Sequence, residues 1–259
     1  MVTQTRDKRK EQVGGRALER SAMYQLLSQA TAYPSLDTVE TLKTVDLPQA
    51  AQAAAGLPSE LQAMIADLSA CLEATDAAAL QAEHRRLFSH VLSPDCPPCE
   101  TPYTTRDVYQ ETQELSDIRG FFRAFGLDLA DKERPDHISV ELEFMQFLTY
   151  KEAYALRNHG PAKARLCRDV QRKFMKDHLG RWAHRFAGRL AGKAGGGYFA
   201  RVASLTAAFV AADLAFLRTQ PEDALVNPEA RMTDQQDNTC PAAEACSLEE
   251  LGGRDAREN

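Results

Sequence analysis

The sequence predicts an all-α fold, and three observations support that class. Apolar residues recur at spacings of three and four over several long segments, which is typical of helices that bury one face. No stretch of useful length alternates apolar and polar residues as a half-buried strand would. The 259 residues, 44% of them hydrophobic and 26% charged, suffice for a sizeable core. We therefore expect one helical bundle over residues 16–220, between a polar N-terminal tail (1–15) and a polar, cysteine-containing C-terminal tail (221–259).

Three helices are expected in the first part of the chain. The first runs from about Arg16 to Ala30 and ends before Tyr33-Pro34, because the residue before a proline disfavours helical backbone. A connection that contains proline and alanine follows, and the second helix begins at Pro58-Ser59. The third begins at Thr75 or Asp76, since either side chain can cap a helix N-terminus.

Two longer helices are expected in the middle of the chain. One runs from about Thr105 to Phe125 and is closed by Gly126 in a left-handed conformation. The other, "HISVELEFMQFLTYKEAYALRNHG", is the most apolar, with Leu142, Phe144 and Met145 expected in the core. Gly160-Pro161 should end it.

The last part of the chain predicts a basic helix and an apolar one. The basic helix covers 162–179, breaks near Gly180 and resumes towards Leu190. "GKAGGG" at 192–197 is expected to be a flexible joint before the final helix, Tyr198 to Arg218. A monomer or a dimer that exchanges helices around this joint, or around the loop 126–135, is compatible with the sequence.

Charge is distributed unevenly along the chain. Residues 161–193 carry ten lysines or arginines against two acids, so this segment is +8 and the remainder is −14. The simplest interpretation is a solvated helix face. Two alternatives stay open: nucleic-acid binding through the basic helices, which lack a recognised reader motif, and a positive face for an acidic partner.

The sequence lacks the signatures of the common enzyme classes. It has no His-Glu-x-x-His, no Glu-x-x-His pair, no complete phosphate-binding loop and no Gly-x-Ser-x-Gly. No apolar run approaches 18 residues and the charged N-terminus is no secretory signal, so we expect no transmembrane segment and a cytoplasmic location. A non-enzymatic binding protein is the favoured class.

Two short segments stand out as candidate sites. "SPDCPPCETPYTT" at 93–105 places two cysteines and four prolines in one stiff loop. "RPDHISVELEFMQFL" opens the most apolar helix with Asp136 and His137. Asp136 could simply cap that helix, or its carboxylate could pair with a guanidinium of a bound peptide at the mouth of a groove.

Three motifs, in order, carry a family resemblance: "RLFSHV" (86–91), "PPCETPY" (97–103) and "PDHISVELEFM" (135–145). The chain resembles the TorD/DmsD/NarJ family, which are cytoplasmic all-helical chaperones for molybdenum-cofactor redox enzymes exported by the twin-arginine pathway. The resemblance implies an all-helical chaperone that binds the catalytic subunit and its twin-arginine leader, aids cofactor insertion and controls export. Such a chaperone requires no cofactor for that role.

The resemblance also implies a binding site. The residues that would line a groove for the twin-arginine leader are Glu100, Tyr103, Asp136, His137, Leu87 and Phe88. Acidic groups would take the arginines, and apolar walls would take the hydrophobic part of the leader.

The family pattern leaves Cys96 and Cys99 unexplained. The C-terminal tail carries a second pair, Cys240 and Cys246, and two pairs far apart in sequence can close a structural zinc site or an iron–sulfur cluster. A disulfide or redox switch and unrelated thiols are the alternatives.

Overall fold

The computed structural model describes residues 2–88, 96–129 and 133–222, with the backbone alone at 2–14 and 55. Its elements are α1 (Val2–Thr31), α2 (Leu36–Thr41), a π-helical turn η1 (Leu42–Asp46), α3 (Leu47–Ala53), a 3₁₀ turn η2 (Ala54–Gly56), α4 (Ser59–Glu73), α5 (Ala77–Phe88), α6 (Thr101–Thr104), α7 (Val108–Ala124), α8 (Ile138–Asn158), α9 (Pro161–Asp177), α10 (Leu179–Ala194) and α11 (Tyr198–Leu217). Over these ranges the chain is helical and no strand occurs, apart from one isolated bridge between Cys99 and His137. The predicted all-α class is confirmed.

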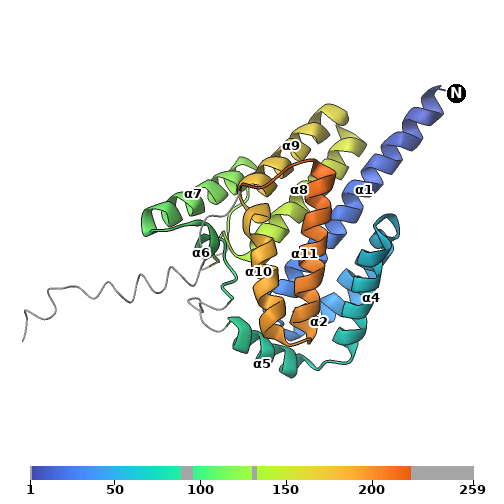
Figure 1. The fold of residues 1–259 in the computed structure, drawn as a ribbon. Helices are drawn as coiled ribbons and strands as arrows, with labels where there is room; N and C mark the ends of the chain where they lie inside the picture. Colours follow the sequence, from blue (N-terminus) through green and yellow to red (C-terminus); the bar gives the residue numbers. More distant parts are fainter. Residues whose placement is uncertain (1, 89–95, 130–132, 223–259) are drawn as a thin grey trace, which may run out of the picture.

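Helix α8 lies in the interior of the bundle. It packs along α1 on one side and α9 on another, while α10 and α11 lie side by side and α11 packs on α4 (Figure 1). Leu142 and Met145 of α8 are fully buried and Phe144 is 3% exposed, as expected. The Phe144 ring contacts those of Phe122 and Phe174, so α8 joins α7 and α9 in one aromatic core.

A buried charged group ties the first helix to three later ones. The guanidinium of Arg20 on α1 binds Asp213 of α11, with Nη2 2.9 Å from Oδ2, and lies 3.5 Å from Glu152 of α8. The Tyr24 hydroxyl donates to Asp213 at 2.7 Å, and Arg168 of α9 binds Glu152. We call these five residues the arginine cluster. Its two guanidinium groups face two carboxylates.

Several predicted helix ends are confirmed. Asp76 caps α5 by accepting from the backbone N–H of Ala78 at 2.7 Å. Gly126 has φ +70°, and the N–H of Leu127 reaches the carbonyl of Phe122 at 3.0 Å, which closes α7 as a left-handed cap. Gly160, at φ +84°, separates α8 from Pro161 at the start of α9.

Other predicted boundaries were wrong. Helix α1 begins at Val2, earlier than the expected start at about Arg16. The connection after Pro34 contains α2, η1 and α3, which are too short for a periodic pattern to reveal. The helix expected from Thr105 begins later, because the Asp107 carboxylate accepts from the N–H of Tyr109 at 2.9 Å and caps α7.

The break between α9 and α10 falls at His178 rather than Gly180. The backbone of His178 has φ −131° and ψ −99°, outside the helical region. Gly180 makes this sharp turn sterically possible, because a Cβ at that position would lie 2.2 Å from the carbonyl oxygen of Met175. The turn directs the His178 side chain into the protein, where it is fully buried.

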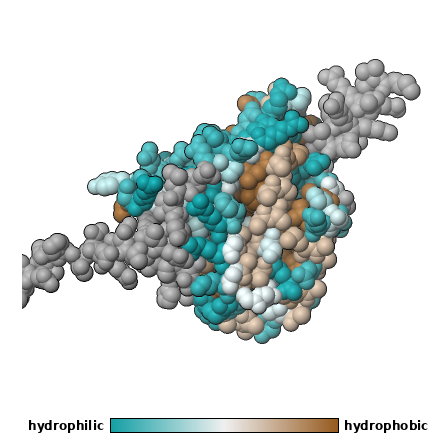
Figure 2. Space-filling view, in the orientation of Figure 1, coloured by the Kyte–Doolittle hydropathy of each residue, from teal (hydrophilic) through white to brown (hydrophobic). Residues whose placement is uncertain are grey.

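Helix α11 is apolar on nearly all sides. By length and composition it could cross a membrane, with a mean hydropathy of 1.6 over its best 18-residue window, although no uninterrupted apolar run predicts this. In the bundle α11 packs on α10 and α4, and 44% of that window is buried. Its outer face forms the pale hydrophobic strip in Figure 2 and includes exposed Ala211 and Ala215.

Candidate functional site

The cysteine loop and the start of α8 are joined by backbone hydrogen bonds. The N–H of Glu100 donates to the carbonyl of Asp136 at 2.8 Å, and the N–H of Ile138 donates to the carbonyl of Pro98 at 2.8 Å. These bonds flank the bridge between Cys99 and His137. The two segments singled out from the sequence therefore meet, and we call residues 96–104 together with 134–139 the junction.

Asp136 is fully buried at the junction and does not face the mouth of a groove, contrary to the prediction. It also does not cap α8. Its Oδ2 instead accepts from the N–H of Thr101 at 3.2 Å and from the Thr101 hydroxyl at 2.8 Å, at the start of α6. The sequence could not distinguish these roles, because α6 is only four residues long.

Arg134 already pairs with the Asp136 carboxylate. Its Nε lies 2.9 Å from Oδ1 and its Nη2 3.0 Å from Oδ2, a bidentate arrangement. The same Nη2 also donates to Thr101 at 3.0 Å and to Glu111 at 3.1 Å. The Arg134 side chain is 37% exposed, so the partner of the buried carboxylate reaches the surface.

His137 is the residue that caps α8. Its Nδ1 accepts from the N–H of Ser139 at 3.2 Å, so the capping nitrogen carries no proton. Burial lowers the pKa of His137 to about 4, with Asp136 opposing and Arg134 reinforcing that shift. Burial, together with the charges of His137 and Arg85, also lowers the pKa of His84 to about 4. Both imidazoles are therefore neutral at pH 7.

The predicted apolar residues take different positions around the junction. Leu87 belongs to the core. Phe88 is half-buried and packs on His84 at 4.7 Å and Phe199 at 5.6 Å between ring centroids. Tyr103 is fully buried, donates its hydroxyl to the carbonyl of Pro97 at 3.0 Å, and packs on Trp182. Of the predicted apolar wall, only Phe88 is partly accessible.

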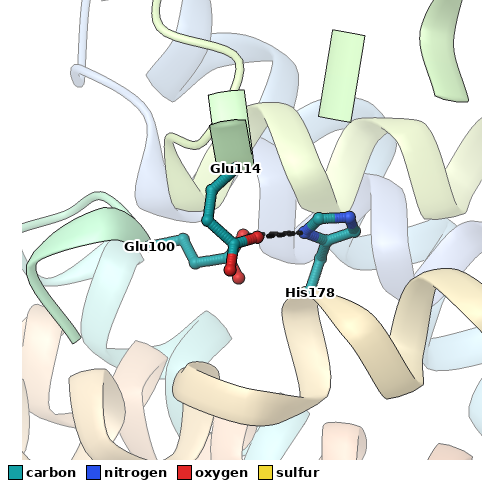
Figure 3. A group of neighbouring side chains, drawn as sticks. All are labelled: Glu100, Glu114 and His178. Atoms are coloured by element: carbon teal, nitrogen blue, oxygen red, sulfur yellow. Dashed lines mark hydrogen bonds and ion pairs between the residues drawn. The ribbon is translucent and has the colours of Figure 1, made fainter. Parts of the chain in front are cut away.

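Glu100 points away from Asp136 into a second group of charges. Its Oε2 lies 3.1 Å from Nδ1 of His178, and its Oε1 lies 3.6 Å from Nη1 of Arg181. The other nitrogen of His178, Nε2, lies 3.0 Å from Oδ2 of Asp117. Glu114 approaches the same imidazole, with Oε2 3.9 Å from Nδ1, and accepts from Arg181 at 3.1 Å (Figure 3).

One more carboxyl completes this group. Glu141 of α8 is fully buried, accepts from the indole N–H of Trp182 at 3.1 Å and interacts with Glu100. Burial and the charge of Glu100 raise the pKa of Glu141 well above its usual range, so Glu141 retains its proton at neutral pH. We call Glu100, Glu114, Asp117 and Glu141, with His178 and Arg181, the carboxyl cluster.

The carboxyl cluster raises the pKa of its histidine. Burial alone would lower the pKa of His178, but the hydrogen bonds to Glu100 and Asp117 and the nearby carboxylates outweigh it. Burial raises the pKa of Glu100 despite its bond to His178. The family motif accounts for Glu100, whereas no local pattern marks His178 or Arg181, which lie far along the sequence.

The two cysteines of the loop are buried. Burial, with Asp136 nearby, raises the pKa of Cys99, which disfavours the thiolate that a metal requires. Cys240 and Cys246 lie outside the described residues, so the proposed four-cysteine site stays a prediction.

Much of the basic segment is neutralised within the bundle. Arg168 and Arg181 bind buried or half-buried carboxylates, and Arg172, Lys173 and Lys176 pair with carboxylates nearer the surface. Glu152, Glu114 and Glu222 lie outside residues 161–193, whereas Asp169 and Asp177 belong to the segment and are already counted in its charge. These pairs therefore offset part of the charge asymmetry.

The fold and the junction define an all-helical binding protein, and comparison with known proteins specifies its family. Residues 54–188, just over half of the chain, match the family model described as nitrate reductase delta subunit. The chain belongs to this family, which confirms the predicted resemblance to chaperones of redox-enzyme maturation.

Two curated relatives match parts of the chain. The perchlorate reductase assembly chaperone protein of Dechloromonas aromatica is 33% identical over 39% of this chain and 45% of its own length. The selenate reductase assembly chaperone protein of Thauera selenatis is 35% identical over 29% of this chain and 39% of its own. The matches thus span less than half of either relative. Both are named as chaperones, which agrees with the expectation that this chain is not an enzyme.

One solved structure is also similar. It is described as a redox enzyme maturation protein from Archaeoglobus fulgidus, with 23% sequence identity and a TM-score of 0.47. The similarity covers 74% of this chain and 93% of that one.

Proposed function

We propose that this protein is a cytoplasmic assembly chaperone for the catalytic subunit of a molybdenum-containing oxidoreductase, and that it binds the twin-arginine leader of that subunit at the junction. Family membership and the names of the two curated relatives support the chaperone role. A cytoplasmic location follows from the role, because a leader must be held before export. Cofactor insertion would occur while the catalytic subunit is bound.

The pairing of Asp136 with Arg134 is the observation that carries the leader-binding part of the proposal. A buried carboxylate that accepts a guanidinium at both oxygens, 2.9 and 3.0 Å away, has the geometry needed to bind a leader arginine. Arg134 is partly exposed and lies outside the helices, so it can leave without disturbing one. The leader would therefore exchange one of its arginines for Arg134.

The surroundings of the carboxylate suit such an exchange. Glu111, which also accepts from Arg134, would be released together with Asp136 and could take part in binding the second arginine. On the other side of His137, the half-buried rings of His84 and Phe88 offer an apolar contact for the residues that follow the arginines. Both imidazoles are neutral at pH 7, so they add no repulsion toward a cationic peptide.

Peptide binding by calorimetry tests the exchange. Asp136→Asn keeps the size of the side chain but removes its charge, and we expect leader affinity to fall by about 1–3 kcal/mol. Arg134→Gln removes the internal competitor, and we expect tighter binding than in the unmodified protein. A leader with both arginines changed to lysine is the control ligand and should bind weakly, because lysine cannot bind both carboxylate oxygens in a fixed geometry.

The two variants also separate binding from stability. Asp136 makes several buried bonds, so its replacement should lower the free energy of unfolding more than loss of a helix cap would. If Asp136→Asn stays folded by circular dichroism and binds the leader normally, the junction is not the leader site. Weaker binding by Arg134→Gln would likewise contradict an exchange.

We also retain the proposal of a structural zinc ion or iron–sulfur cluster held by Cys96, Cys99, Cys240 and Cys246. Both loop cysteines are buried, so metal binding would require the loop to expose them and Cys99 to lose its proton. Metal analysis of the purified chain tests this proposal. A metal content of about one per chain that is lost in Cys99→Ser would support it, and metal-free protein would contradict it.

A further inference from the structure

Three side chains of the carboxyl cluster place ligand atoms around one point. Glu100 precedes α6, Glu114 is on α7, and His178 lies between α9 and α10, so three separate elements contribute (Figure 3). One carboxylate oxygen from each glutamate and one nitrogen of the imidazole lie within 4.8 Å of one another. Imidazole nitrogen and carboxylate oxygen form a ligand set suited to divalent transition metals.

An unpartnered buried oxygen points to a missing cation in this group. Glu100 is fully buried and its Oε1 has no hydrogen-bond donor, since Arg181 lies 3.6 Å away. Oε1 of Glu141 lacks a donor as well, but Glu141 interacts with Glu100 and retains its proton, so that oxygen requires no cation. Each unpartnered carboxylate oxygen is costly in the interior unless a proton or a cation lies beside it.

The charges of the cluster lead to the same conclusion. Four carboxyl groups face one guanidinium and one imidazole. A divalent ion at this point would add two positive charges, which together with Arg181 would balance three of the four carboxyl groups.

The far side of the imidazole is arranged as in many metal sites. Metal-binding histidines commonly donate their second ring N–H to a carboxylate, which fixes the tautomer and orients the ring. Here Nε2 of His178 faces Oδ2 of Asp117 at 3.0 Å and leaves Nδ1 directed at Glu100 and Glu114. Asp117 would serve as this orienting residue rather than as a ligand.

We propose that Glu100, Glu114 and His178 form a binding site for a divalent transition-metal ion of the zinc class, separate from the cysteines and independent of the chaperone role. A surface hollow lined by Glu114 and Asp117 adjoins the site and gives the ion a path of entry. Zinc–ligand bonds of about 2.0–2.2 Å require the three atoms to move closer by roughly an ångström. Glu114, whose side chain is 24% exposed, can make that movement.

Arg181 is the competitor that the ion must displace. Its Nη1 now donates to Glu114 at 3.1 Å and to the carbonyl of Asp177 at 3.0 Å. Once Glu114 turns to the ion, Arg181 keeps its hydrogen bond to the carbonyl of Asp177 and remains near Glu100. Binding must also release the proton of His178, because a protonated imidazole offers no lone pair.

Calorimetric titration of the metal-stripped full chain with zinc ion tests the site. We expect one ion per chain and about one proton released near neutral pH, measured from the dependence of the heat on buffer ionisation. Cobalt ion as a second probe should give only weak visible bands, without the intense sulfur-to-metal absorption that thiolate ligands produce. Strong sulfur-to-metal absorption would assign the binding to the cysteines and overturn the proposal.

Matched variants on one helix identify the ligands. Glu114→Gln should lower zinc affinity by at least tenfold, and Asp117→Asn by about 10–100-fold. Glu111→Gln is the control, since Glu111 lies on the same helix with 26% side-chain exposure but binds Arg134 instead. Failure to bind at about 100 µM zinc, or equal losses in Glu111→Gln and Glu114→Gln, would overturn the proposal.

Discussion

The arginine cluster and the carboxyl cluster differ in how their charges are balanced. In the arginine cluster, Arg20 and Arg168 face Asp213 and Glu152, and Gln171 adds a hydrogen bond to Glu152 at 2.9 Å. In the carboxyl cluster, by contrast, carboxyl groups outnumber cations and two carboxylate oxygens lack donors.

This difference separates a structural role from a responsive one. A balanced cluster of hydrogen-bonded charges holds α1, α8, α9 and α11 in one arrangement. Burial and Asp213 raise the pKa of Tyr24 well above its usual range. An unbalanced cluster responds to protons, to cations and to charged partners. In this chain the responsive cluster adjoins the junction, through Glu100, and the structural one lies among the packed helices.

The largest effect is expected from breaking the balanced cluster. Arg20→Met should lower the free energy of unfolding by about 3–5 kcal/mol, because it leaves Asp213 buried without a cation. Urea unfolding followed by circular dichroism measures the change. A loss below about 1 kcal/mol would show that the cluster does not determine how these helices pack.

A smaller effect is expected from the turn that places His178 in the carboxyl cluster. Gly180→Ala introduces a Cβ 2.2 Å from the carbonyl oxygen of Met175 and should cost about 1–3 kcal/mol of folding stability. The backbone must shift to relieve this contact, so the NMR signal of the His178 ring should shift as well. Gly188→Ala is the control, because a Cβ there meets no atom within 4 Å and should be tolerated.

The pH dependence of stability should reflect the carboxyl cluster. The folded-state pKa values of Glu100, Glu141 and His178 are raised, so the folded protein holds protons that the unfolded chain has released. Their stabilising contribution is therefore complete at low pH and is lost as pH rises through the raised values.

Between pH 7 and 9 the loss of stability caused by the carboxyl cluster should not be offset by His84 and His137. The pKa values of His84 and His137 are lowered to about 4, so their contribution to stability rises with pH and is complete above about pH 6.5. We expect the free energy of unfolding to fall by about 1–2 kcal/mol from pH 7 to 9, measured by urea titrations at fixed ionic strength. A rise over this window would mean that the carboxyl cluster is not protonated as described.

The smallest effect should follow from replacing Glu141, whose carboxyl group already carries a proton, by the amide of the same size. Glu141→Gln should change the free energy of unfolding at pH 7 by less than about 1 kcal/mol, since the amide keeps the size and an acceptor for Trp182. The same change from acid to amide at Asp213 should cost several times more, because Arg20 then loses its counter-ion. Equal losses at both positions would remove the distinction between the two clusters.

Local chemistry made much of the fold predictable. The apolar periodicity gave α4, α8 and α11, and Asp76 and Gly126 marked a helix start and end that the structure confirms. The family motif directed attention to Glu100 and Asp136, and the fold brings both to one junction.

What sequence reasoning missed depends on contacts between distant segments. Asp136 caps α6 instead of α8 because a chain segment 35 residues earlier presents its Thr101 N–H there. His178 has no local motif, and its role appears only when α7 and the loop before α6 place Asp117 and Glu100 on either side of its ring. No periodicity or spacing encodes such pairings.

The contact between Arg20 and Asp213 has a consequence for how the chain folds. These residues are 193 positions apart, so the first helix cannot neutralise its buried guanidinium until the last helix has been synthesised. Contacts of such high sequence separation slow folding, because a large loop must close before they form. The bundle should therefore complete its core only after α11 has been synthesised, with the contact of α1 to α11 among the last to form.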